Sequence, residues 1–422
     1  MKKLSLIFVF IIVVSLLAGG GAAMAKQKIV YYGISEWVGG GVGPEYKTAY
    51  EDLAKTFEQE NPGFELELRH DPWDIWVKKL PTLLASGDAP DVFMINNPEF
   101  PAFSNGGYLL DLGEKLDKEY FKQFFQGVLS MYVYDGKNMG IPFTTGANVL
   151  WYNKEIFEAA GLDPNKPPTT WDELKEYAKK CTIKMDGENV YGYGMDLGLQ
   201  EFPQQSLFCG TDSSIIDTET LKGNTNTPEF KGYLELLRDM KPYYEPDFNA
   251  LDHQKVSTLF AQKKVAMIIA GFWPWGINEG LKDETFYNIA LVPKMDSSAP
   301  DGSFAGGFCI GVSSKTKNPD AAIKLAQLIT SPEFNGRLMT DLPTTEEGMK
   351  NSKIAEGLNN PRDQIFLEQI KYGRQGQSKK TIYYAEIDMA VWETVSAVIN
   401  GELSVEQGAA KLEEKINQIT QQ

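Results

Sequence analysis

The sequence has few of the residues on which metal and catalytic chemistry usually depend. Among 422 residues there are only two histidines, His70 and His253, and three cysteines, Cys181, Cys209 and Cys309, with no CxxC pair. A histidine-based zinc site would need nearly all of the histidines. We interpret the cysteines as small buried hydrophobic residues, although an exported chain could join two of them and leave one free.

The sequence patterns of common catalytic loops are also absent. There is no GxSxG, HExxH or GxxxxGK[ST] pattern, and the glycines at 39–43 lack GxGxxG. Carboxylate pairs such as Asp71 and Asp74 could serve a glycosidase, but 57 acidic residues produce such pairs by chance. We therefore expect no catalytic residue, no metal ligand and no cofactor.

An excess of positive charge is missing as well. Lys and Arg number 41 against 57 Asp and Glu, which gives a net charge of −16 and argues against a nucleic-acid partner. After residue 25 no apolar run is long enough to span a bilayer. The apolar fraction of 42% is ordinary for a soluble globular chain, and the length favours two lobes over one core.

The first 25 residues are typical of a secretory signal. Lys2 and Lys3 precede an apolar run, Leu4–Leu17, and Ala23–Ala25 forms an A-x-A site. The run is shorter than the roughly 20 residues of a spanning helix, which is the alternative interpretation. We expect an exported protein, periplasmic or extracellular, cleaved after Ala25 and without a lipid-anchor cysteine.

Strand and helix patterns alternate along the remaining chain. Ile29–Gly33 and Asp91–Ile95 are typical of buried strands, and apolar residues between 46 and 57 recur at helical spacing. A helix is predicted over Trp73–Ser86, which Pro81 should kink or break. Such alternation predicts an α/β fold with parallel strands.

Several helix starts and strands are marked in the second half. Capping boxes are predicted at Thr170 with Glu173 and at Ser404 with Gln407. Strands are predicted at Val265–Ala270, Ile289–Val292 and Phe308–Val312. Open α/β sheets bind ligands at the carboxyl ends of their strands. The loops to which this rule points are Asn96–Phe100, Thr144–Ala147 and Gly271–Gly276.

Aromatic residues make up 12% of the chain, and several lie in predicted loops. Gly271–Gly276 (GFWPWG) is the densest case and directly follows a predicted buried strand. Flat indoles suit the apolar face of a sugar ring, although both tryptophans could instead be core residues. Trp37, before the glycine loop, is a further candidate ligand contact. Trp73 and Trp76 fit the inner face of a helix and are more readily core.

Nine short segments, spread over nearly all of the mature chain, follow a recognisable order. They are Phe57–Glu65, Leu84–Val92, Gly107–Leu112, Gly140–Phe143, Leu150–Lys154, Ala160–Glu173, Lys264–Gly276, Ala321–Ser331 and Gly401–Leu412. This order resembles the extracellular solute-binding proteins of ABC importers, family 1, a group that includes maltose-binding and glycerol-3-phosphate-binding proteins.

The resemblance implies an α/β, two-lobed periplasmic-binding-protein fold of a type II-like kind. Each lobe would hold a mixed or parallel sheet flanked by helices, with the ligand cleft at the hinge. Lobe one would comprise 26–142 and 300–343, and lobe two 146–292 and 347–422, with crossings near 141–145, 292–304 and 342–346.

The resemblance also implies ligand contacts in both lobes. They are Asn96, Asn97 and Glu99 in a lobe-one loop, Thr144, Thr145 and Gly146 at the hinge, Trp273 and Trp275 in GFWPWG, and Tyr384 and Asp388 in the C-terminal part. At the position of Tyr384 and Asp388 this chain lacks the tryptophan of the maltose binders. Its lobe-one loop also lacks their charged pair. These departures argue against a maltodextrin ligand.

The function implied is capture of a carbohydrate, a mono- or oligosaccharide, and its delivery to the transmembrane subunits of an ABC permease with their ATPase. We expect a monomer. A phosphorylated polyol or acidic sugar is an alternative ligand, favoured if Arg69, Arg337, Arg362 or Arg374 lies in the cleft. A secreted glycoside hydrolase, or a sensor or adhesin that presents its ligand to a receptor, are further alternatives.

Overall fold

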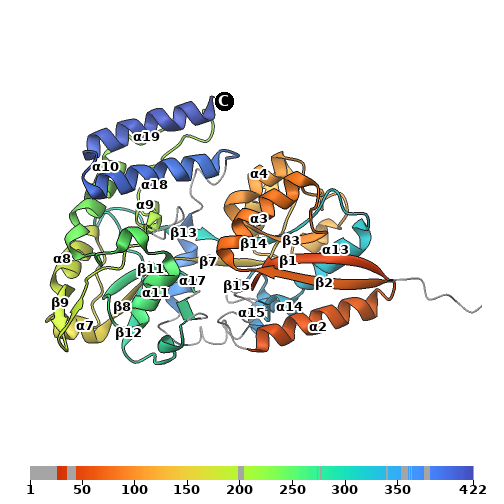
Figure 1. Ribbon diagram of the computed structural model, residues 1–422, viewed down its shortest axis with the longest axis horizontal. Coiled ribbons are helices and arrows are strands. Elements are labelled where there is room, and N and C mark those ends of the chain that lie inside the picture. Colours follow the sequence, from red (N-terminus) through yellow and green to blue (C-terminus); the bar gives the residue numbers. More distant parts are fainter. Residues whose placement is uncertain are drawn as a thin grey trace, which may run out of the picture.

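The computed structural model describes residues 26–35, 44–197, 204–272, 274–275, 278–338, 341–352, 360, 362, 364–374 and 381–421. The chain forms two α/β lobes that lie side by side (Figure 1). Trp37 and Trp273 lie outside the described residues.

The sheet of lobe one has the order β2-β1-β3-β14-β6 among the described residues. Strand β1 is parallel to β2 and β3, whereas β14 is antiparallel to β3 and β6. The strands are β1 (Gln27–Ile34), β2 (Phe64–Asp71), β3 (Val92–Asn96), β14 (Phe308–Val312) and β6 (Ile141–Pro142). The helices that accompany them are α2 (Pro44–Glu60), α3 (Trp73–Ser86), α4 (Phe100–Asn105), α13 (Pro319–Ile329) and α14 (Pro332–Asn335).

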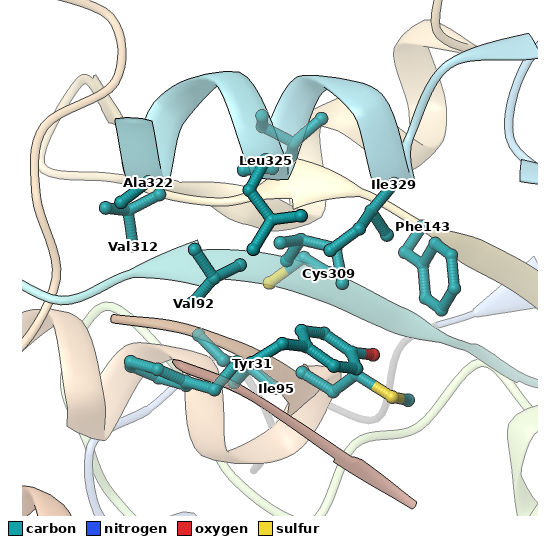
Figure 2. Packing of buried hydrophobic residues seen from close by; sticks show 14 of the residues in the cluster. Tyr31, Val92, Ile95, Phe143, Cys309, Val312, Ala322, Leu325 and Ile329 are labelled. Carbon is teal, nitrogen blue, oxygen red and sulfur yellow. The ribbon is translucent and has the colours of Figure 1, made fainter. Parts of the chain in front are cut away.

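Side chains from segments far apart in the sequence form the core of lobe one. Figure 2 shows α13 lying over β14, with Leu325 and Ile329 directed toward the strand and with Tyr31 and Ile95 beneath it. Each fully buried side chain of this size stabilises the lobe by about 2 kcal/mol. The core therefore joins the N-terminal strands to the segment 308–338.

Pro81 does not break α3, so of the two outcomes expected from sequence, a kink or a break, the break is wrong. The helix runs continuously from Trp73 to Ser86 and ends at Gly87, whose φ of 88° is the left-handed conformation that glycine tolerates. Trp76, Leu80 and Leu84 are buried along one side of the helix. Burial of this apolar side offsets the loss of one backbone hydrogen bond at proline.

Lobe two is built on a sheet of order β11-β8-β12 in the described part of the chain. The central strand β8 (Val149–Asn153) is antiparallel to both β11 (Met267–Ala270) and β12 (Tyr287–Ala290). The main helices are α8 (Trp171–Cys181), α10 (Pro228–Asp239), α11 (His253–Ala261), α18 (Tyr384–Asn400) and α19 (Val405–Thr420). The predicted strands 265–270 and 289–292 are thus found, shifted by about two residues.

The two predicted capping boxes differ in outcome. At α19 the box is complete, because Ser404 Oγ accepts from the Gln407 N–H and Gln407 Oε1 accepts from the Ser404 N–H. At α8, Thr170 Oγ1 accepts from the Glu173 N–H, but Glu173 Oε2 accepts from Thr169 instead. The prediction is confirmed at α19 and holds for only one of the two bonds at α8.

A third sheet, which we call the crossing sheet, joins the lobes. Its order is β15-β7-β13-β16, and its strands are β15 (Leu342–Pro343), β7 (Thr144–Ala147), β13 (Ser303–Gly306) and β16 (Gly373–Arg374). Strand β7 leads from β6 of lobe one to β8 of lobe two, and β13 leads back to β14 (Figure 1). Helix α17 (Gln364–Lys371) contacts β7 and β13.

The remaining elements are short. They are α5 (Lys118–Phe121), α6 (Gln126–Leu129), α7 (Lys154–Ala159), α9 (Gln205–Cys209), α15 (Glu346–Asn351), β4 (Val133–Tyr134), β5 (Lys137–Asn138), β9 (Ile183–Met185), β10 (Glu188–Val190) and the single turns η2 (Asn97–Glu99), η3 (Ser130–Tyr132), η4 (Lys241–Tyr243), η5 (Phe248–Ala250) and η6 (Glu279–Lys282). All three cysteines are free, and Cys181 and Cys309 are buried. In the described part of the chain, every helix is too short or too polar to cross a membrane.

Candidate functional site

The crossing sheet has one packed face and one partly exposed face. Directly opposed residues of antiparallel strands share a face, and successive residues alternate between faces. The packed face consists of Thr145 and Ala147 of β7, Ala305 of β13 and Leu342 of β15, all buried. Leu342 belongs to the same hydrophobic cluster as Phe366 of α17, so α17 covers this side.

The other side, which we call the open face, carries Gly146 of β7 and Phe304 of β13, with Asp341 just before β15. These residues are partly exposed, whereas their neighbours along the strands are buried. A Cβ placed on Gly146 would meet no heavy atom of the described residues within 4 Å. The Phe304 ring lies against Gly306, whose Cβ would be 3.0 Å from Phe304 Cζ. The open face therefore presents an aromatic ring beside free space.

Thr144 lies at the edge of the open face but holds the strands together. Its Oγ1 accepts a hydrogen bond of 3.0 Å from the Phe308 N–H, and its side chain is fully buried. The backbone passes closely here, because a Cβ on Gly307 would be 2.1 Å from the Thr144 carbonyl oxygen. Gly307 also has a φ of 153°, which L side chains rarely adopt.

The lobe-one loop follows the carboxyl end of β3. Asn96 ends the strand opposite Phe308, and the turn η2 holds Asn97, which is buried, and Glu99, which is partly exposed. Trp73 lies at the same edge, with its ring 6.0 Å from the Phe308 ring. Trp73 is partly exposed, while its neighbour Trp76 is buried as the sequence indicated.

Helix α18 brings lobe two toward this loop. Tyr384 and Asp388 lie in its first two turns and are buried, and α18 contacts η2. The residues predicted as ligand contacts in lobe one and in the C-terminal part therefore belong to neighbouring elements. Their convergence depends on the tertiary fold, since more than half of the chain separates them.

Trp275 is anchored in the core of lobe two. Its indole Nε1 donates to the Tyr287 hydroxyl, and its ring lies 5.0 Å from the Trp151 ring. The Phe366 ring is 5.5 Å away, and the Arg362 guanidinium lies over the indole at 5.5 Å. These contacts fix the position of the loop after β11.

All five arginines of the chain have protein partners. Arg69 pairs with Glu67, Arg238 with Asp239, Arg337 with Asp52 and Arg362 with Glu284, at nitrogen–oxygen distances of 2.7 to 3.1 Å, and Arg374 donates to the Thr211 carbonyl at 2.8 Å. Of the four arginines that sequence could not place, Arg374 pairs with Phe304 in the register of β13 with β16, and its guanidinium donates to the Thr211 carbonyl.

Sequence reasoning did not single out Phe304 and Asp341. Phe304 stands in a glycine-rich segment, Gly302–Gly307, which resembles GFWPWG in composition and could have drawn attention. Asp341 carries no such signal, because it is one acidic residue among 57 and its position depends on the pairing of β15 with β7.

Two α/β lobes joined by strands that run between them are the architecture of two-lobed binding proteins, and the sequence comparison agrees. The chain belongs to the bacterial extracellular solute-binding protein family, whose sequence profile matches residues 40–335. The resemblance read from the nine segments is thereby confirmed. The family binds solutes and is extracellular, which is consistent with binding without turnover.

Two proteins with similar sequences are binding proteins. A binding protein of Brucella abortus is 28% identical over 313 residues, 71% of this chain and 74% of that protein. The diacetylchitobiose-binding protein DasA of Streptomyces coelicolor is 26% identical over 312 residues, 72% of this chain and 71% of that protein.

Solved structures confirm the two-lobed fold. An ABC transporter solute-binding protein of Thermotoga lettingae, bound to α-D-tagatose, matches with a TM-score of 0.78 and 26% identity, covering 94% of this chain and 99% of that one. A substrate-binding protein of Listeria monocytogenes in complex with cycloalternan matches with a TM-score of 0.77 and 23% identity, covering 94% and 99%, and supports the fold alone.

Proposed function

We propose that this chain is the extracytoplasmic binding component of an ABC importer and captures a neutral mono- or oligosaccharide between its lobes. The observation that carries the proposal is the open face of the crossing sheet, where the Phe304 ring lies beside the free space at Gly146. A sugar site needs an apolar wall together with a few placed polar groups. The names of relatives that bind diacetylchitobiose and α-D-tagatose support the same ligand class.

The crossing sheet supplies the hinge in this proposal. A ligand that contacts both lobes favours their closed arrangement by its difference in affinity for the two arrangements. Helix α17 covers the packed face and holds the three crossings together while the lobes move. The closed, loaded protein would dock on the permease subunits as a monomer, after export and cleavage behind Ala25.

The proposed ligand contacts come from both lobes. They are Asn96, Asn97 and Glu99 of the lobe-one loop, Gly146 of the hinge, Tyr384 and Asp388 of α18, and Trp37 and Trp273, which lie outside the described residues. We assign supporting roles to Thr144, which bonds Phe308, to Thr145, which is buried on the packed face, and to Trp275, which bonds Tyr287. Replacement of Trp273 by Ala should weaken binding by about tenfold, the effect of one stacking contact.

A phosphorylated polyol is the second candidate ligand. The sn-glycerol-3-phosphate-binding protein UgpB of Brucella abortus is 26% identical over 221 residues, 51% of this chain and 48% of that protein. Phosphate recognition usually relies on arginine forks. Because each of the five arginines already has a protein partner, we favour the neutral sugar.

Thermal unfolding of the protein from Lys26 onward tests the proposal. The panel is α-D-tagatose, maltotriose, mannotriose, diacetylchitobiose and glycerol 3-phosphate. At least one neutral sugar should raise the melting temperature, since a ligand at 100 times its Kd adds about 2.7 kcal/mol to the free energy of unfolding. Hydrolysis of the sugar, or a response to glycerol 3-phosphate alone, would contradict the proposal.

A further inference from the structure

Asp341 occupies an unusual place at the junction of the lobes. It directly precedes β15, in which Leu342 pairs with Thr145 and Pro343 with Thr144. One further step in this register sets Asp341 beside Gly146. The side chain of Leu342 is buried on the packed face, so Asp341 belongs to the open face.

Among the described residues, no protein group compensates the Asp341 carboxylate, which makes neither a hydrogen bond nor an ion pair there. Burial alone raises the pKa of Asp341 to about 7, although the residue remains partly exposed. Many protein atoms therefore surround the carboxylate while part of the residue still contacts solvent.

In the part of the chain that the structure describes, the charged groups on adjoining elements do not balance Asp341, whose pKa shift has burial as its only cause. At the end of α14, Arg337 pairs with Asp52 at 2.8 Å. The first residues of α15, Glu346 and Glu347, carry the same sign as Asp341. A carboxylate in this position costs stability unless a partner from outside the protein completes its hydrogen bonds.

We propose that Asp341 is a specificity-determining residue that accepts hydrogen bonds from the hydroxyl groups of the bound ligand. The free space at Gly146 places those hydroxyls beside the carboxylate, and the Phe304 ring holds the apolar side of the sugar. The like charge disfavours phosphorylated and carboxylated ligands. This inference rests on the proposed function and narrows it to neutral polyhydroxy ligands.

The test compares wild type with Asp341→Asn, which keeps the shape and removes the charge. Glu235→Gln is the matched control, because Glu235 is exposed on α10, away from the crossing sheet. Affinity is measured by calorimetry at pH 8 for each neutral sugar of the panel that binds wild type. The melting temperature of each unliganded variant is measured in the same buffer.

Asp341→Asn should lose at least tenfold in affinity and melt at a higher temperature without ligand, because an unpaired carboxylate has been removed. Glu235→Gln should match wild type within twofold in affinity. An affinity of Asp341→Asn equal to wild type, or a lower unliganded melting temperature, would overturn the inference alone. If no neutral sugar binds even to wild type, the proposed function fails and this inference with it.

Discussion

The two faces of the crossing sheet differ in exposure, although the same strands form both. On the packed face, Leu342 is 1% exposed and joins the cluster that includes Phe366. On the open face, Gly146 and Asp341 are partly exposed, and the carboxylate lacks a partner among the described residues. The comparison teaches that adjacent residues can have different roles: Leu342, the first residue of β15, packs against the core, while Asp341, just before the strand, is the residue that we propose contacts the ligand.

The largest expected effect is on stability and comes from the packed face. Leu342→Ala removes a buried side chain and leaves a cavity against α17. The free energy of unfolding should fall by about 3 kcal/mol, the usual cost of such a truncation. Denaturant unfolding measures this change, and a loss below about 1 kcal/mol would show that the packed face does not hold the hinge.

The next largest effect is a pH dependence of the free energy of unfolding, which we attribute to Asp341 on the open face. The native state holds the Asp341 proton with a pKa of about 7, against an ordinary value of 3.8, so it binds more protons than the unfolded state between these values. The free energy of unfolding should therefore fall as pH rises from about 4 to about 7, by roughly 2 kcal/mol after allowance for partial exposure.

His70 gives a control of opposite sign. Burial lowers the pKa of His70 to about 4, and its ring lies 4.9 Å from the Tyr50 ring. Its contribution to the free energy of unfolding is present above the unfolded pKa of 6.5 and is lost as pH falls toward 4.

The difference in unfolding free energy between wild type and Asp341→Asn, measured from pH 4 to 8, isolates the effect of Asp341 from that of His70. A difference independent of pH would refute the assignment.

Phe304→Ala should affect binding more than stability. The ring is partly exposed on the open face and packs against Gly306. Loss of stacking should weaken binding of a neutral sugar by about tenfold, while the free energy of unfolding changes by less than about 1.5 kcal/mol. Calorimetry and denaturant unfolding of the same preparation give both values. The reverse pattern, with stability lost and affinity kept, would make Phe304 a core residue.

The smallest expected effect is that of Gly146→Ala. The added methyl group meets no atom of the described part of the chain within 4 Å, so the free energy of unfolding should stay within about 0.5 kcal/mol of wild type. Affinity should fall about threefold because the methyl group enters the ligand space. Gly307→Ala is the contrasting variant, since its methyl group would clash with the Thr144 carbonyl and destabilise the fold.

Much of the fold could be predicted from the sequence because its signals are local. The apolar run Asp91–Ile95 corresponds to β3, and Ser404 with Gln407 marks the start of α19. The break expected at Pro81 does not occur, because the burial of Trp76, Leu80 and Leu84 outweighs the local preference of proline.

The candidate site was less predictable because it depends on pairing between distant segments. Strand β15 has two residues and no periodicity, and its register with β7 alone places Asp341 beside Gly146. Trp275 attracted attention as a glycine-flanked indole, but its bond to Tyr287 and its contact with Trp151 appear only in the folded lobe. The composition of a loop shows that it is rich in aromatic residues, but it does not show which of the rings remains accessible to solvent in the folded protein.

The most direct test of the central claim is X-ray scattering from the purified protein with and without a saturating neutral sugar from the panel, followed by recovery of that sugar. The account predicts a smaller radius of gyration with sugar bound, as the lobes close, and chemically unchanged sugar on release. An unchanged radius with every sugar offered, or a cleaved product, would contradict it.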